Sequence, residues 1–143
     1  MIIRSTRFGD ITSSEDQLIT FEPGIFGFEN HHKYVLLQLD EKDSTFQALQ
    51  SVDDEDLAFV ITEPFLFKRD YEFELPVAVR NQLGIEREED TQVFSIITIR
   101  SQNDITINLK APIIYNKALN KAAQIVLESV VYSIRHPLTK GGS

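Results

Sequence analysis

The chain has 143 residues, of which 42% are hydrophobic and 25% are charged, and it carries a formal net charge of -8 at pH 7. This size and balance are typical of one globular domain and exclude a disordered chain. The absence of cysteine excludes disulfides, thiolate metal sites and a cysteine nucleophile. Because no apolar run nears the roughly 20 residues of a membrane span, and the first ten residues lack the apolar core of a signal peptide, we expect a cytoplasmic protein without membrane contact. We expect a single domain over 1–143, with 139–143 as a flexible tail.

The charge is unevenly distributed along the chain. Residues 1–99 carry 20 acidic and 8 basic side chains, whereas 100–143 carry 2 and 6. The densest acidic stretch, 53–74, holds eight acids and two bases. Such a field attracts basic partners and repels phosphate, which disfavours direct nucleic-acid binding. Acidity that serves only solubility is the simpler alternative.

Most of the chain has sequence patterns that are typical of β-strands. The first glycine pair, in PGIFGF at 23–28, predicts a turn. Pro76 at its start and Gly84 at its end predict one helix over 75–85. We expect an all-β fold, a small closed or partly open β-barrel or sandwich of about eight to ten short strands with one short helix. Seven short segments have the composition or alternation of strands: 33–40, 45–51, 57–63, 92–100, 104–112, 123–128 and 130–135.

The segment PFLFKRDYEFEL, at 64–75, joins aromatic and acidic residues. Its apolar side chains fall mostly on odd positions and three of its acids on even ones. This period of two predicts a strand with one wet face, which a turn at 68–70 interrupts. One interpretation makes the aromatic residues core and the acids a soluble edge; the other makes the segment a surface for a basic partner.

No motif of catalysis or of cofactor binding is present, and we predict neither a cofactor nor a metal. The acids from Asp53 resemble a calcium loop only loosely. Ala58 and Pro64 stand where that loop requires Gly and Glu. Adjacent His31 and His32 would point apart on a regular element and make a poor chelate.

Five sequence blocks, which cover nearly the whole chain in order, carry a more specific signal. They are FEPGIFGFE (21–29), LQSVDDEDLAFVIT (49–62), PFLFKRDYEFEL (64–75), NLKAPIIYN (108–116) and QIVLESVVYSIRHPL (124–138). In content and spacing they resemble the bacterial flagellar assembly factor FliW family. The terminal GGS is the one visible departure.

The resemblance implies a binding protein, not an enzyme. Members of that family bind flagellin before its export and, once flagellin has left, bind CsrA, a small basic RNA-binding regulator that represses flagellin translation. We expect this chain to be a monomer on its own. We expect Phe67 and Tyr71 to face a partner and Phe65 and Phe73 to pack inward. The predicted partner-binding residues are Asp53, Asp54, Asp56, Phe67, Asp70, Tyr71, Glu72 and Glu74.

Two other functions compete with this prediction. A small β-barrel enzyme would need paired carboxylates, such as Asp53 and Asp54, deeply buried beside a cavity. A direct RNA-binding barrel would need its C-terminal basic residues on one face beside exposed aromatic rings. The basic residues concerned are Arg100, Lys110, Lys117, Lys121 and Arg135, with Tyr115 and Tyr132 as the available rings.

Overall fold

The computed structural model describes residues 1–138, which form eleven strands, one α-helix and three short 3-10 helices. The expected tail, 139–143, lies outside the described residues. The strands are β1 (Ile2–Ser5), β2 (Gly9–Thr12), β3 (Ile19–Phe21), β4 (Lys33–Asp40), β5 (Asp43–Ser51), β6 (Ala58–Thr62), β7 (Thr91–Ser101), β8 (Asp104–Ile107), β9 (Ile113–Asn116), β10 (Lys121–Gln124) and β11 (His136–Pro137). The helices are η1 (Glu15–Gln17), η2 (Pro64–Leu66), α1 (Val77–Gln82) and η3 (Glu88–Asp90).

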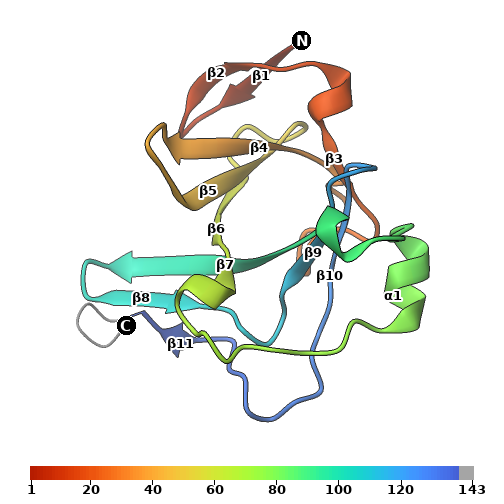
Figure 1. Ribbon diagram of the computed structural model, residues 1–143. Coiled ribbons are helices and arrows are strands. Elements are labelled where there is room, and N and C mark those ends of the chain that lie inside the picture. The colour runs from red at the N-terminus through yellow and green to blue at the C-terminus, as the bar shows by residue number, and fades with distance from the viewer. Residues whose placement is uncertain (139–143) are drawn as a thin grey trace.

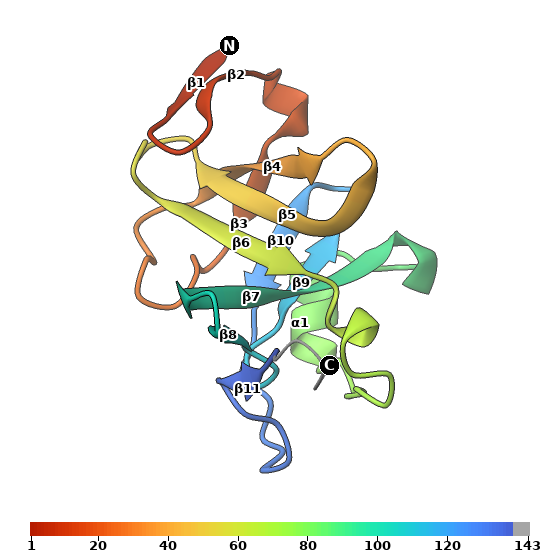
Figure 2. The same cartoon turned by 90° about the vertical axis from the view of Figure 1, so that its left-hand side faces the viewer.

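Seven of these strands close into a barrel (Figures 1 and 2). Their order is β7-β6-β5-β4-β3-β10-β9, and the pairing of β9 with β7 completes the circle. Neighbours are antiparallel except β3 and β10, which run parallel. The expected all-β barrel with one short helix is therefore confirmed.

Strand β7 is long enough to belong to two structures. Its first residues, 91–94, pair with β9, and 95–97 pair with β6. Its last residues leave the barrel and form the predicted hairpin with β8, to which β11 adds an edge. At the opposite end of the molecule, the separate hairpin β1-β2 covers the barrel (Figure 1).

Two apolar cores occupy the two faces of the barrel wall. Phe21, Tyr34 and Phe94 fill the interior and are fully buried. Neighbours on a strand point to opposite faces, so Ile113 joins the interior core while Ile114 joins a second core outside. Each such buried side chain stabilises the fold by roughly 1.5–3 kcal/mol.

The second core is covered by the chain between β6 and β7 and by the C-terminal segment. Figure 1 shows α1 beside the barrel, with the preceding segment passing below it. Pro76 stands at the N-cap of α1, and Gly84 follows the helix with a φ of +65°. The helix is therefore where the sequence predicts it, although it is shorter than 75–85. Among residues 1–138, none of the helices has the length and apolar character that a membrane crossing requires.

Two predicted strands are absent, and two others are too long, since only 123–124 of segment 123–128 belong to β10 and only 104–107 of segment 104–112 form β8. Segment 64–75 begins with η2 and a turn, in which Pro64 accepts from the N–H groups of Phe67 and Lys68, and it continues without strand pairing. Proline has no N–H for a ladder, so the strand ends before it. Segment 130–135 is an exposed loop, and regular pairing resumes only at β11.

Candidate functional site

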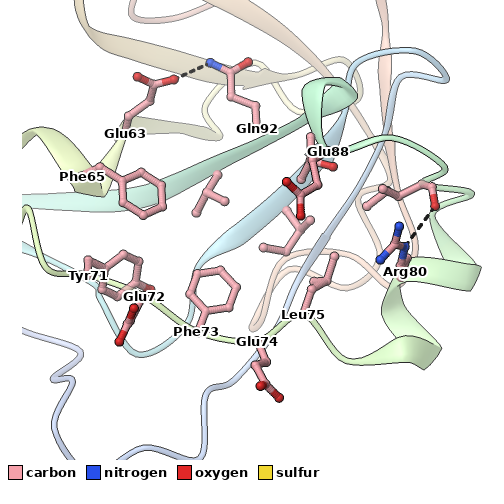
Figure 3. A pocket seen from close by; sticks show the side chains of 14 residues that line it. Glu63, Phe65, Tyr71, Glu72, Phe73, Glu74, Leu75, Arg80, Glu88 and Gln92 are labelled. Atoms are coloured by element: carbon pink, nitrogen blue, oxygen red, sulfur yellow. Dashed lines mark hydrogen bonds between the residues drawn. The ribbon is translucent and has the colours of Figure 1, made fainter.

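A groove of about 760 Å³ lies between the barrel wall and the segment 71–76, which we call the strap. The strap forms one side, the start of β7 the other, and residues near α1 and η3 close one end (Figure 3). The groove is open to solvent along its length.

The floor of the groove is apolar because of alternation along the strap. Tyr71, Phe73 and Leu75 turn inward, whereas Glu72 and Glu74 are exposed. In Figure 3 the inward side chains project from the strap into the groove. Val93 of β7, Ile114 of β9, Ile85 and Phe65 complete the apolar lining.

The rim of the groove is acidic. Among residues 1–138, four carboxylates and one cation, the guanidinium of Arg80, line it. Glu63 accepts a hydrogen bond of 2.8 Å from Gln92. Within residues 1–138, the carboxylates of Glu72, Glu74 and Glu88 have neither a hydrogen-bond donor nor an ion-pair partner. These three charges are therefore available to a partner.

Tyr71 anchors the strap to the second core. Its side chain is 2% exposed, and its hydroxyl donates a 2.6 Å hydrogen bond to the carbonyl of Leu109. Its ring meets that of Tyr132 edge to face, with centroids 4.7 Å apart. Burial, and to a smaller degree Tyr132, raises the pKa of Tyr71 above its usual value. The tyrosine stays protonated and keeps its donor role.

The acidic loop, residues 53–56, lies far from the groove. Strand β6 begins just after this loop and ends just before the groove, so the two acidic stretches occupy opposite ends of one strand. Both cartoon views place the loop beside the β1-β2 hairpin (Figures 1 and 2). The structure therefore does not join Asp53, Asp54 and Asp56 with the strap acids in one patch.

Hydrogen bonds fix the acidic loop. The Ser51 hydroxyl accepts from the N–H groups of Asp53 and Asp54, at 3.2 and 3.1 Å. The Asp54 carboxylate accepts from the Asp56 N–H at 2.9 Å, and the Asp56 carboxylate accepts from Thr6. Asp53 and Asp56 are exposed, and Asp54 is half-buried. Two of the three carboxylates therefore also hold the loop together.

The predicted orientation of the aromatic residues is wrong for Tyr71 and Phe65. Tyr71 is buried, whereas Phe65 is 42% exposed at the end of the groove. The turn that the prediction required is present at 68–70, where the Tyr71 N–H donates to the Lys68 carbonyl, but it directs Tyr71 into the second core and leaves Phe65 exposed on η2. Phe67 is half-buried, with its ring 5.9 Å from that of Phe46. Phe73 packs inward, as predicted.

The remaining predicted acid, Asp70, is exposed at the turn that enters the strap. Lys68 holds its carboxylate at 3.1 Å and lowers its pKa. Of the residues that line the groove, only Tyr71, Glu72 and Glu74 were predicted to bind a partner, and contributors such as Glu63, Arg80 and Glu88 were missed. Glu88 lies well beyond the acidic stretch, so no local pattern could have joined it to the strap.

The competing functions lack their structural requirements. The carboxylates of Asp53 and Asp54 are not deeply buried, as an acid-catalysing pair would be. Arg100 lies near the end of β7, whereas Lys117 follows β9 beside the start of β7, so these two basic residues are at opposite ends of that strand and do not form one patch. Among residues 1–138, no group of three His, Asp or Glu is arranged to hold a metal ion.

Known proteins resemble this chain over its full length. The family pattern described as FliW protein matches residues 2–138. The chain belongs to the FliW family. Flagellar assembly factor FliW of Bacillus velezensis is 44% identical and is covered to 99%, over all of this chain. The protein of that name from Bacillus subtilis is 41% identical, with 96% of each chain covered.

A solved structure shares both the sequence and the fold. The crystal structure of a flagellar assembly factor FliW is 36% identical, covers all of both chains and superposes with a TM-score of 0.90. The resemblance seen in the five sequence blocks is thus confirmed, and the family consists of flagellar assembly factors by the names of these relatives.

Proposed function

We propose that this chain is a cytoplasmic flagellar assembly factor that works by exchanging protein partners. It binds flagellin and, when flagellin has been exported, binds CsrA and relieves the repression of flagellin translation. No chemical step on a substrate is part of this function. The proposal follows from membership of the FliW family.

The observation that supports partner binding most directly is the groove. An apolar floor next to unpaired carboxylates suits a protein segment that brings apolar and basic side chains. The floor provides contact area, and the charged rim sets the preference for a basic partner. Glu72 and Glu74 belong to this rim, and Tyr71 holds the strap in place. Asp70, paired with Lys68 at the turn before the strap, adds negative charge outside the groove.

The acidic loop has a second role in the proposal. Asp53, Asp54 and Asp56 attract the basic CsrA over long range and raise its rate of association. Phe67, half-buried beside Phe46, contributes an apolar contact outside the groove. The two acidic stretches thus act on one partner in different ways.

Calorimetric titration with CsrA, alone and after saturation with flagellin, tests the exchange. We expect CsrA to bind the free protein and flagellin to abolish that binding. Equal CsrA binding in both titrations would contradict partner exchange. Binding of neither protein would contradict the whole proposal.

Charge reversal tests the groove. We expect Glu72→Lys with Glu74→Lys to weaken CsrA binding about tenfold or more, since like charges then face the basic partner. The matched control is Glu15→Lys with Glu41→Lys, which changes the net charge equally at two exposed sites, in η1 and between β4 and β5, that do not line the groove. Equal weakening by both pairs would show that only net charge matters and would remove the groove from the mechanism.

A further inference from the structure

The backbone of the strap has unused hydrogen-bonding groups. Within residues 1–138, the N–H and C=O groups of Phe73, Glu74 and Leu75 make no hydrogen bond. The strap nevertheless has the alternation of a strand, with odd side chains inward and even ones outward. It is therefore a single strand over the barrel wall, without a neighbour.

The direction of these groups follows from a bond at Glu72. The Tyr132 hydroxyl accepts from the Glu72 N–H at 3.0 Å and donates to the Glu72 C=O at 3.1 Å. Both groups of Glu72 thus point to the edge that faces the C-terminal segment. Successive residues of an extended chain address opposite edges, so the groups of Phe73 and Leu75 point to the other edge, where the groove lies.

The groove has space for one more strand beside the strap and an apolar floor against which that strand can pack. It extends from the strap to the start of β7 and is floored by apolar side chains such as Val93 and Ile114 (Figure 3). A strand laid there would pair with Phe73 and Leu75 and would place every second side chain on this floor.

Charge selects the sequence of that strand. The outward side chains of the strap are Glu72 and Glu74, and opposite charges on neighbouring strands are favourable. Glu63 and Glu88 add negative charge along the rim, against Arg80 alone. A strand that alternates apolar residues with Lys or Arg complements both the floor and the rim.

We propose that the strap receives an extended, basic segment of CsrA as an added β-strand, paired with the backbone of Phe73 and Leu75. This inference rests on the proposed function, since it names how one of the two partners binds. It commits to the basic partner because the groove carries four carboxylates and one cation.

Residue-resolved amide hydrogen exchange of the full chain tests the added strand. The protein is measured free, with CsrA and with flagellin. We expect CsrA to slow exchange at Phe73 and Leu75 about tenfold or more, because paired amides exchange only after opening. The amide of Glu72, already bonded to Tyr132, provides the internal control and should change little.

The other outcomes separate the two proposals. A CsrA complex with unchanged exchange at Phe73 and Leu75 would overturn the added strand and leave partner binding intact. Protection by flagellin alone would overturn the choice of partner. The absence of any complex would overturn the proposed function, and the added strand with it.

A second variant keeps the test independent of side-chain charge. Glu74→Gln removes one charge without altering the backbone, so exchange protection at Phe73 and Leu75 should persist while affinity falls a few-fold. Protection that disappears together with the charge would show that CsrA contacts side chains only, which would contradict strand addition.

Discussion

The two acidic stretches have similar composition, and each is close to a buried tyrosine, yet they are built differently. In the acidic loop, two carboxylates are engaged in local hydrogen bonds, and the buried Gln50 bonds the backbone beneath. In the strap, the carboxylates of Glu72 and Glu74 have no partner among residues 1–138, and the backbone groups of Phe73, Glu74 and Leu75 are unpaired as well. Acidic charge therefore stabilises a loop in one place and remains free for a partner in the other.

The tyrosines repeat this contrast. Tyr34, whose pKa responds to Asp53 and Asp54, is fully buried, and its hydroxyl has no partner among residues 1–138. Tyr71, at the start of the strap, donates from its hydroxyl to the carbonyl of Leu109. Near the acidic loop, the polar group without a hydrogen-bond partner is the buried Tyr34 hydroxyl. In the strap, the groups without a partner among residues 1–138 are backbone groups at the surface, where another protein can reach them.

The largest effect is expected from Gln50→Leu. The Gln50 amide donates to the carbonyls of Asp54 and Leu57 at 3.1 Å, and its oxygen accepts from Ser5 at 2.7 Å. Loss of these buried bonds should lower the free energy of unfolding by about 3 kcal/mol. Urea denaturation measures this change in the free energy of unfolding, and Gln47→Leu on the same strand is the control. Equal losses would contradict a special role for Gln50.

The second prediction concerns high pH. Burial, with smaller effects from Asp53 and Asp54, raises the pKa of Tyr34 to about 12. The unfolded chain then loses this proton first, so stability falls as pH rises from about 10 to about 12. Over this pH range the Tyr34→Phe variant should lose about 2 kcal/mol less of its free energy of unfolding than the unmodified protein. Stability measured across this range checks it, and parallel curves for both proteins would contradict it.

The third prediction tests the anchor of the strap. Tyr71→Phe leaves the buried carbonyl of Leu109 without its donor and should cost about 1–2 kcal/mol in thermal unfolding. Tyr132→Phe, which loses longer and more exposed bonds to Glu72, is the comparison and should cost less. A larger cost for Tyr132 would reverse this assignment of the anchor.

The smallest effect is expected from the loop carboxylates. Replacement of Asp53, Asp54 and Asp56 by Asn should slow CsrA association about threefold at low salt and flatten its salt dependence. Stopped-flow kinetics at several salt concentrations measure both quantities. An unchanged rate and slope would remove the loop from binding and leave it a purely structural element.

Local patterns predicted much of the barrel. Strands 33–40, 45–51 and 57–63 lie within two residues of their observed bounds, because alternation and β-branched residues act over a few neighbours. The helix ends followed from Pro76 and Gly84, whose backbone preferences are local as well.

The failures arise where distant contacts decide. Val130 is 95% exposed although its β-branched neighbourhood favours a strand, because strand formation depends on tertiary pairing and segment 130–135 pairs with no strand among residues 1–138. The four-residue β9 was not predicted, although it closes the barrel. The groove is formed by the strap, the start of β7 and Glu88, and no local sequence pattern predicts that these lie side by side.

The parallel pair β3-β10 also limits how early the barrel can close while the chain is being synthesised. Thr20 pairs with Lys121, and Phe21 pairs with Ala122, so this part of the barrel wall joins residues that are 101 positions apart in the sequence. Contacts of such separation form slowly because a long loop must be ordered first. A nascent chain on the ribosome can build the β4-β5-β6 meander early, but it must wait for β10 before its interior core is sealed from water.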